Sequence, residues 1–327
     1  MSASKSPAWD SRRLVDVQCD AAPRLAGLSE IEQSIVEAVA YADVFDCAVT
    51  SDEIHRYLPR QRTELKDVVD CLEGDGLTRR LTRNGHYVCL KGREELFEER
   101  RSREGFSRSL WNRAQRYAAL IASAPYVRMV AVSGSLAVDS AAGEADIDFF
   151  VVTDPNHLWR ARAWVKLIEV LDNRFGTGML CVNLFRTVRT LEFPTGDLYI
   201  AHELAQMVPL YDEGVYDEIR RRNSWALEML PNAAGHPRPV NPCTPRLPWF
   251  KRLTEHLLGG RFGKWLEDWE STRKIERHRR RVADASEWEL STRETTARRL
   301  FIGREILAQL NAGLSRLQRQ TRTELPD

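Results

Sequence analysis

Residues 130–152 are VAVSGSLAVDSAAGEADIDFFVV, and this stretch decides the fold of the central part of the chain. It begins with an apolar run and passes through Gly134-Ser135. After ten further residues it reaches Asp146-Ile147-Asp148, which opens a second apolar run. Short apolar runs bounded by turn residues are typical of buried strands. We therefore predict strands at residues 126–133 and 147–152, joined by a glycine turn and the start of a helix.

The same stretch suits the phosphates of a nucleotide. Glycine lets the backbone approach a phosphate closely, and the N–H groups at the following helix start, with the Ser135 hydroxyl, can bond phosphate oxygens. Residues two apart on a strand point to the same side, so Asp146 and Asp148 converge while Ile147 points into the core. Two such carboxylates can hold one or two Mg²⁺ (or Mn²⁺) ions together with substrate phosphates. The plainer interpretation is a tight turn beside a solvated strand end.

Four residues, Gly134, Ser135, Asp146 and Asp148, stand where the DNA polymerase beta-like nucleotidyltransferase superfamily has its signature. That signature is an apolar strand, Gly-Ser or Gly-Gly, about ten residues, then Asp-apolar-Asp. The chain resembles this superfamily over about residues 110–215. The resemblance implies transfer of a nucleoside monophosphate from a nucleoside triphosphate, ATP first among them, to a hydroxyl, with Mg²⁺ and release of pyrophosphate. Asp146 and Asp148 would be catalytic and metal-binding, Gly134 and Ser135 nucleotide-binding. The acceptor stays open between a small molecule, a nucleic acid and a protein.

One departure from the superfamily concerns its third carboxylate, which lies on a later strand. The matching strand here, residues 179–185, offers Asn183, which is neutral and cannot take a proton. Four acids elsewhere are alternatives: Glu192, Asp197, Asp139 and Glu144. Otherwise the site manages with two acids. The alternative function is therefore a regulatory protein that senses nucleotide without catalysis and binds DNA or a protein partner through its N-terminal domain.

That N-terminal domain, residues 29–92, has the pattern of a winged helix-turn-helix, preceded by a loose arm at residues 1–28. The expected elements are helices that begin near Ser29, Thr50 and Thr63, then strands at residues 77–82 and 86–90. Thr50 and Glu53 form a capping box, and Asn84-Gly85 is the residue pair that most readily forms a hairpin turn.

Charge argues against strong DNA binding by this domain. Its third helical segment, residues 60–73, has three basic and four acidic side chains, whereas a helix in the major groove should be basic. The expected wing carries Arg79, Arg80 and Arg83, so weak DNA contact stays open.

The remaining segments alternate between helix and strand. A helical connector at residues 93–124 leads into a nucleotidyltransferase domain at residues 125–230, with helices at 158–171, 198–208 and 215–230. This alternation predicts an α+β fold with a mixed sheet. Residues 231–248 hold six of the fourteen prolines and form a linker. The basic region 249–327 should be helical, with long helices at 249–284 and 287–319.

Four further side chains are lesser candidates. A surface or packing role is the alternative for His202, and core packing is the alternative for at least one of Trp159 and Trp164. His202 and Glu203 could act near the acceptor, while Trp159 and Trp164 could stack on a base. The basic run at residues 273–281 could bind RNA or another polyanion, although a solvated helix face is the commoner meaning of such a run.

Composition excludes several classes of protein. The chain has 327 residues with 48 basic and 47 acidic side chains, so it is neither disordered throughout nor a polycationic coat for nucleic acid. Residues 246–327 carry 18 basic and 12 acidic side chains, which leaves 30 and 35 in residues 1–245. The six cysteines are widely spaced, and neither a signal peptide nor an apolar run of membrane-spanning length is present. We expect a cytoplasmic protein with reduced thiols and no membrane partner.

Overall fold

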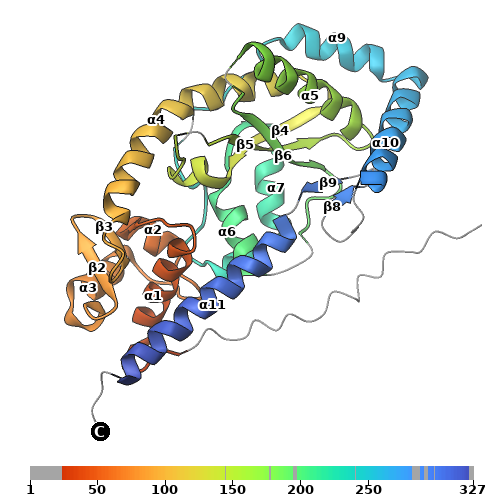
Figure 1. The fold of residues 1–327 in the computed structure, drawn as a ribbon. Helices are drawn as coiled ribbons and strands as arrows, with labels where there is room; N and C mark the ends of the chain where they lie inside the picture. The colour runs from red at the N-terminus through yellow and green to blue at the C-terminus, as the bar shows by residue number, and fades with distance from the viewer. Residues whose placement is uncertain are drawn as a thin grey trace, which may run out of the picture.

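The computed structural model has an α+β fold with two sheets, which confirms the predicted class (Figure 1). The smaller sheet has the strand order β1-β3-β2, and the larger, mixed sheet has the order β7-β4-β5-β6-β9-β8. The structure describes residues 24–143, 145–176, 178–193, 197–239, 241–281, 288–290, 294–297 and 299–323.

The smaller sheet belongs to an N-terminal helical unit. Its elements are α1 (Glu30–Asp43), β1 (Val49–Thr50), α2 (Ser51–Arg56), α3 (Leu65–Glu73), η2 (Asp75–Leu77), β2 (Leu81–Asn84) and β3 (Tyr87–Leu90). The capping box is confirmed: Thr50 Oγ1 accepts from the Glu53 N–H at 3.2 Å, and Glu53 Oε2 accepts from the Thr50 N–H at 2.8 Å. Gly85 has the positive φ of +64° that the hairpin turn requires. The strand expected from residue 77 begins only at Leu81, because residues 75–77 form a 3₁₀ turn that buries Leu77.

The larger sheet is built from the segment that the sequence singled out. Its elements are α4 (Leu96–Ile121), β4 (Val127–Ser133), η3 (Gly134–Val138), β5 (Ile147–Thr153), α5 (Leu158–Phe175), β6 (Leu180–Thr187), α6 (Leu198–Gln206), β7 (Val208–Asp212), α7 (Val215–Arg222) and α8 (Trp225–Met229). Strand β5 pairs antiparallel with β4 and parallel with β6, which places Ser133 opposite Asp148 and Asp148 opposite Cys181.

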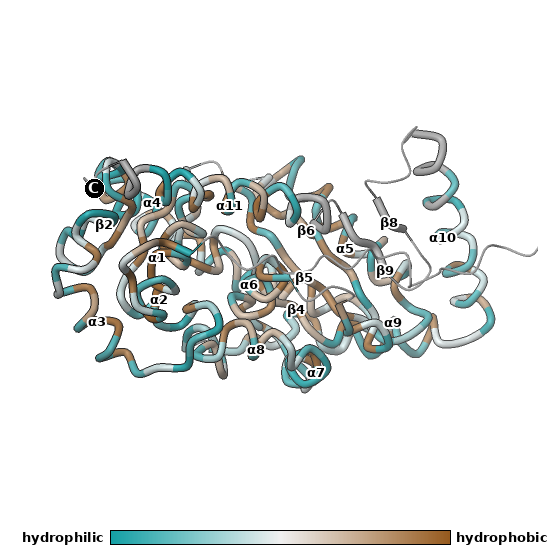
Figure 2. Tube along the Cα trace, turned by 90° about the horizontal axis from the view of Figure 1, so that it is seen from below, coloured by the Kyte–Doolittle hydropathy of each residue, from teal (hydrophilic) through white to brown (hydrophobic). Residues whose placement is uncertain are grey.

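Alternation along β5 separates two hydrophobic cores. Phe149 and Val151 pack with Trp159 of α5 on one face of the sheet. Phe150 and Val152 belong to the core on the other face, which also includes residues of α1, α6 and α11 (Arg299–Thr323). Figure 2 shows the N-terminal helices α1–α3 at one end of the molecule and α9 (Pro248–Leu258) and α10 (Arg261–Arg281) at the other. The N-terminal unit, the sheet and the last helix therefore share one core.

Two helices end earlier than the sequence indicated. The helix expected at residues 198–208 stops at Gln206, and residues 208–212 form strand β7, which sequence analysis missed. The helix expected at 215–230 is divided into α7 and α8. The buried Asn223 lies at the break, and its side chain donates to Leu191 O and accepts from the Phe193 N–H. The hydrogen bonds of the buried Asn223 amide with these backbone groups compensate for the helical hydrogen bonds that are lost at the break.

The C-terminal region, residues 249–327, departs further from the helices that the sequence predicted. The helix expected at 249–284 is broken at Gly259-Gly260 into α9 and α10. The helix expected at 287–319 starts instead with β8 (Trp288–Leu290) and β9 (Glu294–Ala297), and β9 extends the larger sheet by pairing with β6. Of the segment 287–319, the described residues from 299 onward are helical as expected and form α11, which packs Leu310 and Leu314 into the shared core.

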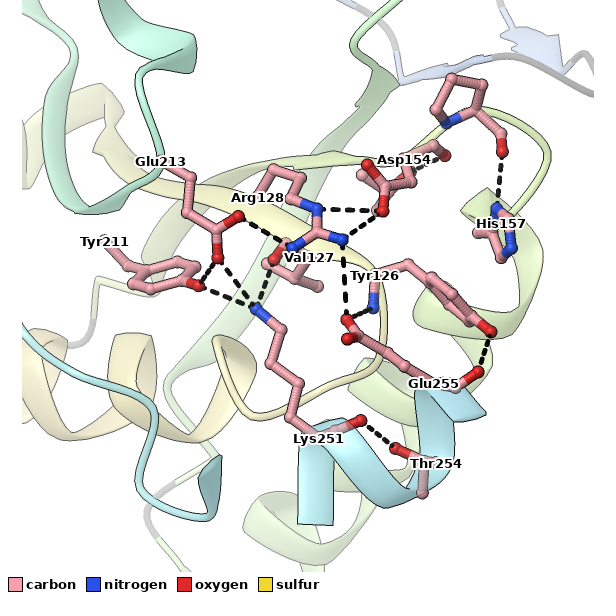
Figure 3. Close-up of polar contacts among 12 residues, drawn as sticks. Tyr126, Val127, Arg128, Asp154, His157, Tyr211, Glu213, Lys251, Thr254 and Glu255 are labelled. Atoms are coloured by element: carbon pink, nitrogen blue, oxygen red, sulfur yellow. Dashed lines mark hydrogen bonds and ion pairs between the residues drawn. The ribbon is translucent and has the colours of Figure 1, made fainter. Parts of the chain in front are cut away.

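A polar network fastens α9 to the end of the sheet where β4 begins (Figure 3). Lys251 Nζ donates to Val127 O at 2.7 Å and to the Tyr211 hydroxyl at 2.8 Å. Arg128 binds Asp154 at 2.9 Å and Glu213 at 2.8 Å. The buried ammonium of Lys251 thus has acceptors on β4 and β7, and the partly exposed guanidinium of Arg128 has acceptors in the residues that follow β5 and β7. The Lys251 contacts hold the basic region against the sheet.

Two expectations about the whole chain can be compared with the structure. Within the described residues, no helix is long and apolar enough to cross a bilayer. The five described cysteines are free thiols, while Cys19 lies outside the described residues.

Candidate functional site

The turn at Gly134 directly contacts Asp148. Gly134 has φ +68°, in the left-handed region that favours glycine. A Cβ built on Gly134 would lie 2.6 Å from Asp148 Oδ2, so any other residue would require the carboxylate to move. The sequence-predicted residues Gly134 and Asp148 are therefore brought together, and Ser135 follows as the next residue of the turn.

The two aspartates lie at the start of β5. Asp146 is exposed and Asp148 is half-buried. Strand alternation places Asp148 on the same face as Phe150, beneath the layer that contains α1 and α6. The helix expected after Ser135 is only the five-residue 3₁₀ turn η3. Phosphate binding would therefore depend on the backbone of the turn and the Ser135 hydroxyl, without a helix dipole.

Asn183 is the residue that the neighbouring strand presents to Asp148. It is the extra residue of a bulge in β6, where Val182 pairs with Phe149 and Leu184 with Phe150. Its Nδ2 donates to Asp148 Oδ1, and its Oδ1 accepts from Cys181 Sγ at 3.1 Å. Burial, reinforced by the charges of Asp148 and Asp146, raises the pKa of Cys181 to about 11. The thiol is thus protonated at neutral pH and fixes which way the amide points.

Two acids that follow β6 do not reach this site. Because β6 runs parallel to β5, its first residues lie beside Asp148 and its last residues lie at the far end of the sheet, where the Val188 N–H donates to Thr153 O. Glu192 follows that far end and is exposed. Asp197 caps α6 by accepting from the Ile200 N–H at 2.8 Å, and burial raises its pKa.

The two acids in the loop before β5 do not supply a third carboxylate either. Asp139 accepts from Trp111 Nε1 at 2.7 Å and pairs with Arg238 at 2.8 Å, so it anchors the proline-rich segment. Glu144 lies outside the described residues. Across the described part of the chain, no group of three or more His, Cys, Asp or Glu side chains could hold a metal ion by itself.

Arg113 of α4 lies near the start of β5, on the face of the sheet opposite Asp148, and sequence analysis did not single it out. Its Nη1 contacts Met179 Sδ at 3.2 Å, and the Met179 carbonyl accepts from the Ile147 N–H at 2.7 Å. An exposed guanidinium on α4 therefore lies next to the residues that start β5. A long helix with many charges gives no sequence signal that selects this arginine.

A cavity of about 320 Å³ has Gly134 and Ser135 in its wall. Its wall includes His202 and Glu203 of α6, two of the lesser sequence candidates, and Tyr41 of α1. The two tryptophans are elsewhere: Trp159 is 1% exposed in the core under α5, and Trp164 stacks on Phe250 at 5.0 Å. They pack and do not line this cavity.

The basic side chains suggested for nucleic acid are largely engaged within the protein. In the wing, Arg80 is buried and donates to Ala26 O, while Arg83 pairs with Glu73. In the basic run, Arg273 pairs with Glu270 and lies over the Trp269 ring. The side chains of residues 275 and 277–281 lie outside the described residues.

No family model, curated protein or solved structure matches this chain.

Proposed function

We propose that the protein is a magnesium-dependent nucleotidyltransferase whose donor site lies at the Gly134-Ser135 turn and the start of β5. The observation that carries this proposal is the contact between Gly134 and Asp148 Oδ2, where a Cβ would lie 2.6 Å from the carboxylate. Glycine adopts the left-handed conformation without strain, and because it has no Cβ it leaves space for a ligand beside the half-buried Asp148 carboxylate. The antiparallel pairing of β4 with β5 and the parallel pairing of β5 with β6 bring both parts of the motif to one sheet end.

The donor set suits a magnesium-nucleotide. Mg²⁺ is commonly held by one or two carboxylates, with substrate phosphates and waters completing its six ligands. Asp146 and Asp148 would hold it, and Asn183 would keep the Asp148 carboxylate in place. When bound, the ion supplies positive charge to the phosphate oxygens. Ser135 and the turn N–H groups would bond the triphosphate.

The proposed reaction is an in-line displacement at the α-phosphorus. The acceptor hydroxyl oxygen forms a new P–O bond, the bond to the β-phosphate bridging oxygen breaks, and pyrophosphate leaves. A carboxylate of the protein takes the hydroxyl proton. The protein contributes mainly position and charge, as phosphoryl transfer generally requires.

Asn183 supports a second candidate, a nucleotide sensor without turnover. An amide stands on β6 beside Asp148, where the superfamily that the sequence resembles has an acid. Two carboxylates suffice for binding, whereas loss of the third removes a group that can accept a proton. Both candidates require the same donor site, and they differ only in chemistry.

One experiment addresses both candidates. The purified full chain is dialysed to equilibrium against each α-labelled nucleoside triphosphate with and without Mg²⁺, then incubated with a cell extract as the source of acceptor. We expect Mg²⁺-dependent binding, pyrophosphate release and transfer of label. Binding without release would favour the sensor.

The variants for this test are Asp146→Asn with Asp148→Asn, and Asp217→Asn as the control. Asp217 is an exposed acid on α7, so its change alters net charge away from the site. Absence of Mg²⁺-dependent nucleotide binding by the unaltered protein, or equal binding by the double variant, would refute the proposed donor site.

A further inference from the structure

Helix α9 buries its polar side and exposes its apolar side. Lys251 is 6% exposed and donates to Val127 O at 2.7 Å. Glu255 Oε1 accepts from the Tyr126 N–H at 2.8 Å. The opposite side is a stripe of exposed apolar residues, each four positions from the next: Trp249, Leu253 and Leu257. A surface helix of a globular protein normally places its apolar stripe on the core and its charges in water.

Helix α10 has the same arrangement. Glu267 is 7% exposed and accepts from the Trp159 and Arg160 N–H groups at 2.8 and 2.9 Å, so its carboxylate caps the first turn of α5. The exposed side carries a row of aromatic rings whose neighbouring centroids lie 5.9 and 6.2 Å apart: Phe262, Trp265 and Trp269. Because Glu267 has its partners on α5, α10 cannot turn these rings inward without breaking the cap.

The two stripes lie at the end of the molecule away from α1–α3, where Figure 2 shows α9 and α10. The same end contains a cavity of about 540 Å³ lined by α5, α9 and α10. Its apolar wall includes Trp269 and the exposed Leu167 and Val170 of α5, so the apolar surface continues from α10 onto α5. Exposed apolar side chains that form one surface of this kind mark an interaction site.

Exposed cations border the two stripes. Arg252, Arg261 and Lys264 each directly precede an exposed apolar residue of a stripe. Successive residues of a helix are about 100° apart, so each cation lies at the edge of its stripe. Within the described residues, none of the three forms an ion pair. The exposed Lys, Arg, Asp and Glu side chains described on the two helices are four bases and two acids: Arg252, Arg261, Lys264, Arg273, Asp268 and Glu276.

The wall of the cavity is basic as well. Five bases and one acid line it: Arg160, Arg162, Lys166, Arg273, Lys274 and Glu270. Three acids pair with four of these bases: Glu169, Glu267 and Glu270. Arg162 instead lies over the Trp159 ring at 5.4 Å and forms no ion pair with the described residues. Five bases against three acids leave an excess of positive charge beside the apolar surface.

An apolar stripe bordered by cations is typical of helices that lie in the surface of an anionic membrane. Trp and long cationic side chains favour the headgroup level, which accommodates both an apolar body and a polar tip. Nucleic acid fits less well, because the aliphatic Leu253 and Leu257 offer no ring on which a base could stack. A second copy of the chain also fits less well, because a two-fold interface would place the basic surface against itself. The charges therefore favour a bilayer with anionic headgroups.

We infer that α9 and α10 bind the surface of a bilayer that contains anionic lipids. The Trp and Leu side chains of the two stripes lie at the boundary of the acyl chains, and the cations lie among the headgroups. The sequence led us to expect no membrane partner because it has no apolar run of spanning length, but a helix that lies in the interface needs none. The inference does not depend on the proposed nucleotidyl transfer.

The test uses vesicles of phosphatidylcholine alone and of phosphatidylcholine with phosphatidylglycerol. Flotation on a density gradient measures binding of the full chain to each kind of vesicle, without nucleotide, at low and at high salt. We expect binding to the anionic vesicles to be stronger by roughly tenfold or more, and to weaken at high salt because the charges are screened. Absence of binding to anionic vesicles, or equal binding to both kinds, would overturn the inference.

A variant of the apolar stripe locates the binding on α9. Leu257→Gln changes an exposed side chain, so the fold should be unaffected, and vesicle binding should weaken roughly tenfold because less apolar area enters the bilayer. Leu65→Gln is the matched control, since Leu65 is an exposed leucine on α3 at the other end of the molecule. Equal effects of the two changes would contradict the site.

Arg252→Gln with Arg261→Gln tests the charges at the edges of the stripes. Loss of the two cations should weaken binding to the anionic vesicles roughly tenfold and leave binding to the neutral vesicles unchanged. Arg62→Gln with Arg79→Gln makes the same change in net charge in the N-terminal unit, where both arginines are exposed, and should have little effect. An equal loss in both double variants would refute binding through this surface, because net charge alone would then account for it.

Two other occupants of this surface would give different results. If sedimentation equilibrium shows a dimer that Leu257→Gln dissociates, and no vesicle binds, the surface is an interface between two copies of the chain. If single-stranded RNA binds, no vesicle does, and Trp265→Gln weakens the RNA binding, the surface is a nucleic-acid site. Either result overturns the inference and leaves the proposed donor site standing, because nucleotide binding is measured separately.

Discussion

The two ends of the β4–β5 pair differ in how their charged side chains are used. At the Val127 end, Arg128 and Lys251 each have acidic or carbonyl acceptors from neighbouring elements. At the Ser133 end, Asp148 meets the neutral amide of Asn183 and the backbone of Gly134, while Asp146 is exposed.

We interpret the Val127 end as a site that stabilises the fold, and we propose that the Ser133 end is a ligand site. Charges matched to charges and carbonyls stabilise packing, whereas neighbouring carboxylates beside a tight turn cost stability unless something binds them. Variants at the Val127 end should therefore change stability and leave nucleotide binding alone. Variants at the Ser133 end should do the reverse.

The largest expected effect is on transfer. Asp146→Asn with Asp148→Asn removes both carboxylates, and we expect transfer and Mg²⁺-dependent nucleotide binding to fall by roughly a thousandfold or more. The melting temperature should stay the same or rise, because repulsion between the acids is removed. Calorimetric melting and equilibrium dialysis measure the two effects; a large drop in melting temperature would show that the acids serve the fold.

Lys251→Met should have the opposite effect, with lower stability and unchanged nucleotide binding. It removes an ammonium that donates to Val127 O and the Tyr211 hydroxyl, and it leaves both acceptors buried. We expect a loss of about 1–3 kcal/mol in the free energy of unfolding, measured by denaturant titration. Nucleotide affinity at a temperature where the variant is folded should not change. A tenfold change in affinity would mean that the two sheet ends are coupled.

Asn183→Asp tests the Ser133 end by placing a third carboxylate beside Asp148, at the position where the superfamily that the sequence resembles has an acid. The new carboxylate would lie within hydrogen-bonding distance of Asp148, so we expect a loss of roughly 1–2 kcal/mol in stability at pH 7 without Mg²⁺. Added Mg²⁺ should recover that loss by binding between the acids. Asn183→Ala is the control, since it loses the amide without creating a metal ligand. Equal responses of the two variants to Mg²⁺ would refute the metal site.

The smallest expected effect is a pH dependence at the Val127 end. Burial favours the protonated form of Glu213, but hydrogen bonds from Tyr211 and Arg128 outweigh it and lower the pKa of Glu213. A lowered folded-state pKa adds stability above the unfolded value, about 4.3, and this stability is lost as pH falls through the folded value. Because Glu213 is partly exposed, the contribution should be about 1 kcal/mol or less.

Comparison of melting temperatures between pH 3 and pH 7 for the unaltered chain and Glu213→Gln measures this effect. The variant should melt lower at pH 7, and the difference should shrink as pH falls below 4. A constant difference across the range would contradict the assignment.

Sequence alone predicted the parts of the fold that local chemistry determines. The capping box at Thr50, the hairpin turn at Gly85 and strands β4 and β5 depend on neighbouring residues or on an unbroken apolar run. Strand β7 was missed because its residues follow α6 without a break in hydrophobicity. Its strand conformation comes from pairing with β4, a contact that local patterns do not contain.

In the candidate site too, sequence predicted the contacts that depend on local patterns and missed those that depend on tertiary packing. The approach of Gly134 to Asp148 follows from the pairing of β4 with β5, two strands that are adjacent in the sequence. The spacing of the motif in the sequence was therefore enough to predict it. The fate of Asp197 as a helix cap and of Asp139 as a partner of Trp111 depends on tertiary packing. The cavity is formed by Tyr41, His202 and Gly134, which lie far apart in the sequence, and no motif joins them.

Helix α11 has a consequence for the order in which the molecule can form. It crosses α1 and α6, where a Cβ on Gly303 would lie 2.8 Å from Tyr199, and Gln318 bonds the Arg24 carbonyl across 294 residues (Figure 1). Contacts of such sequence separation slow folding. On the ribosome, the faces of α1 and α6 that α11 covers would stay exposed until residues 299–323 have emerged.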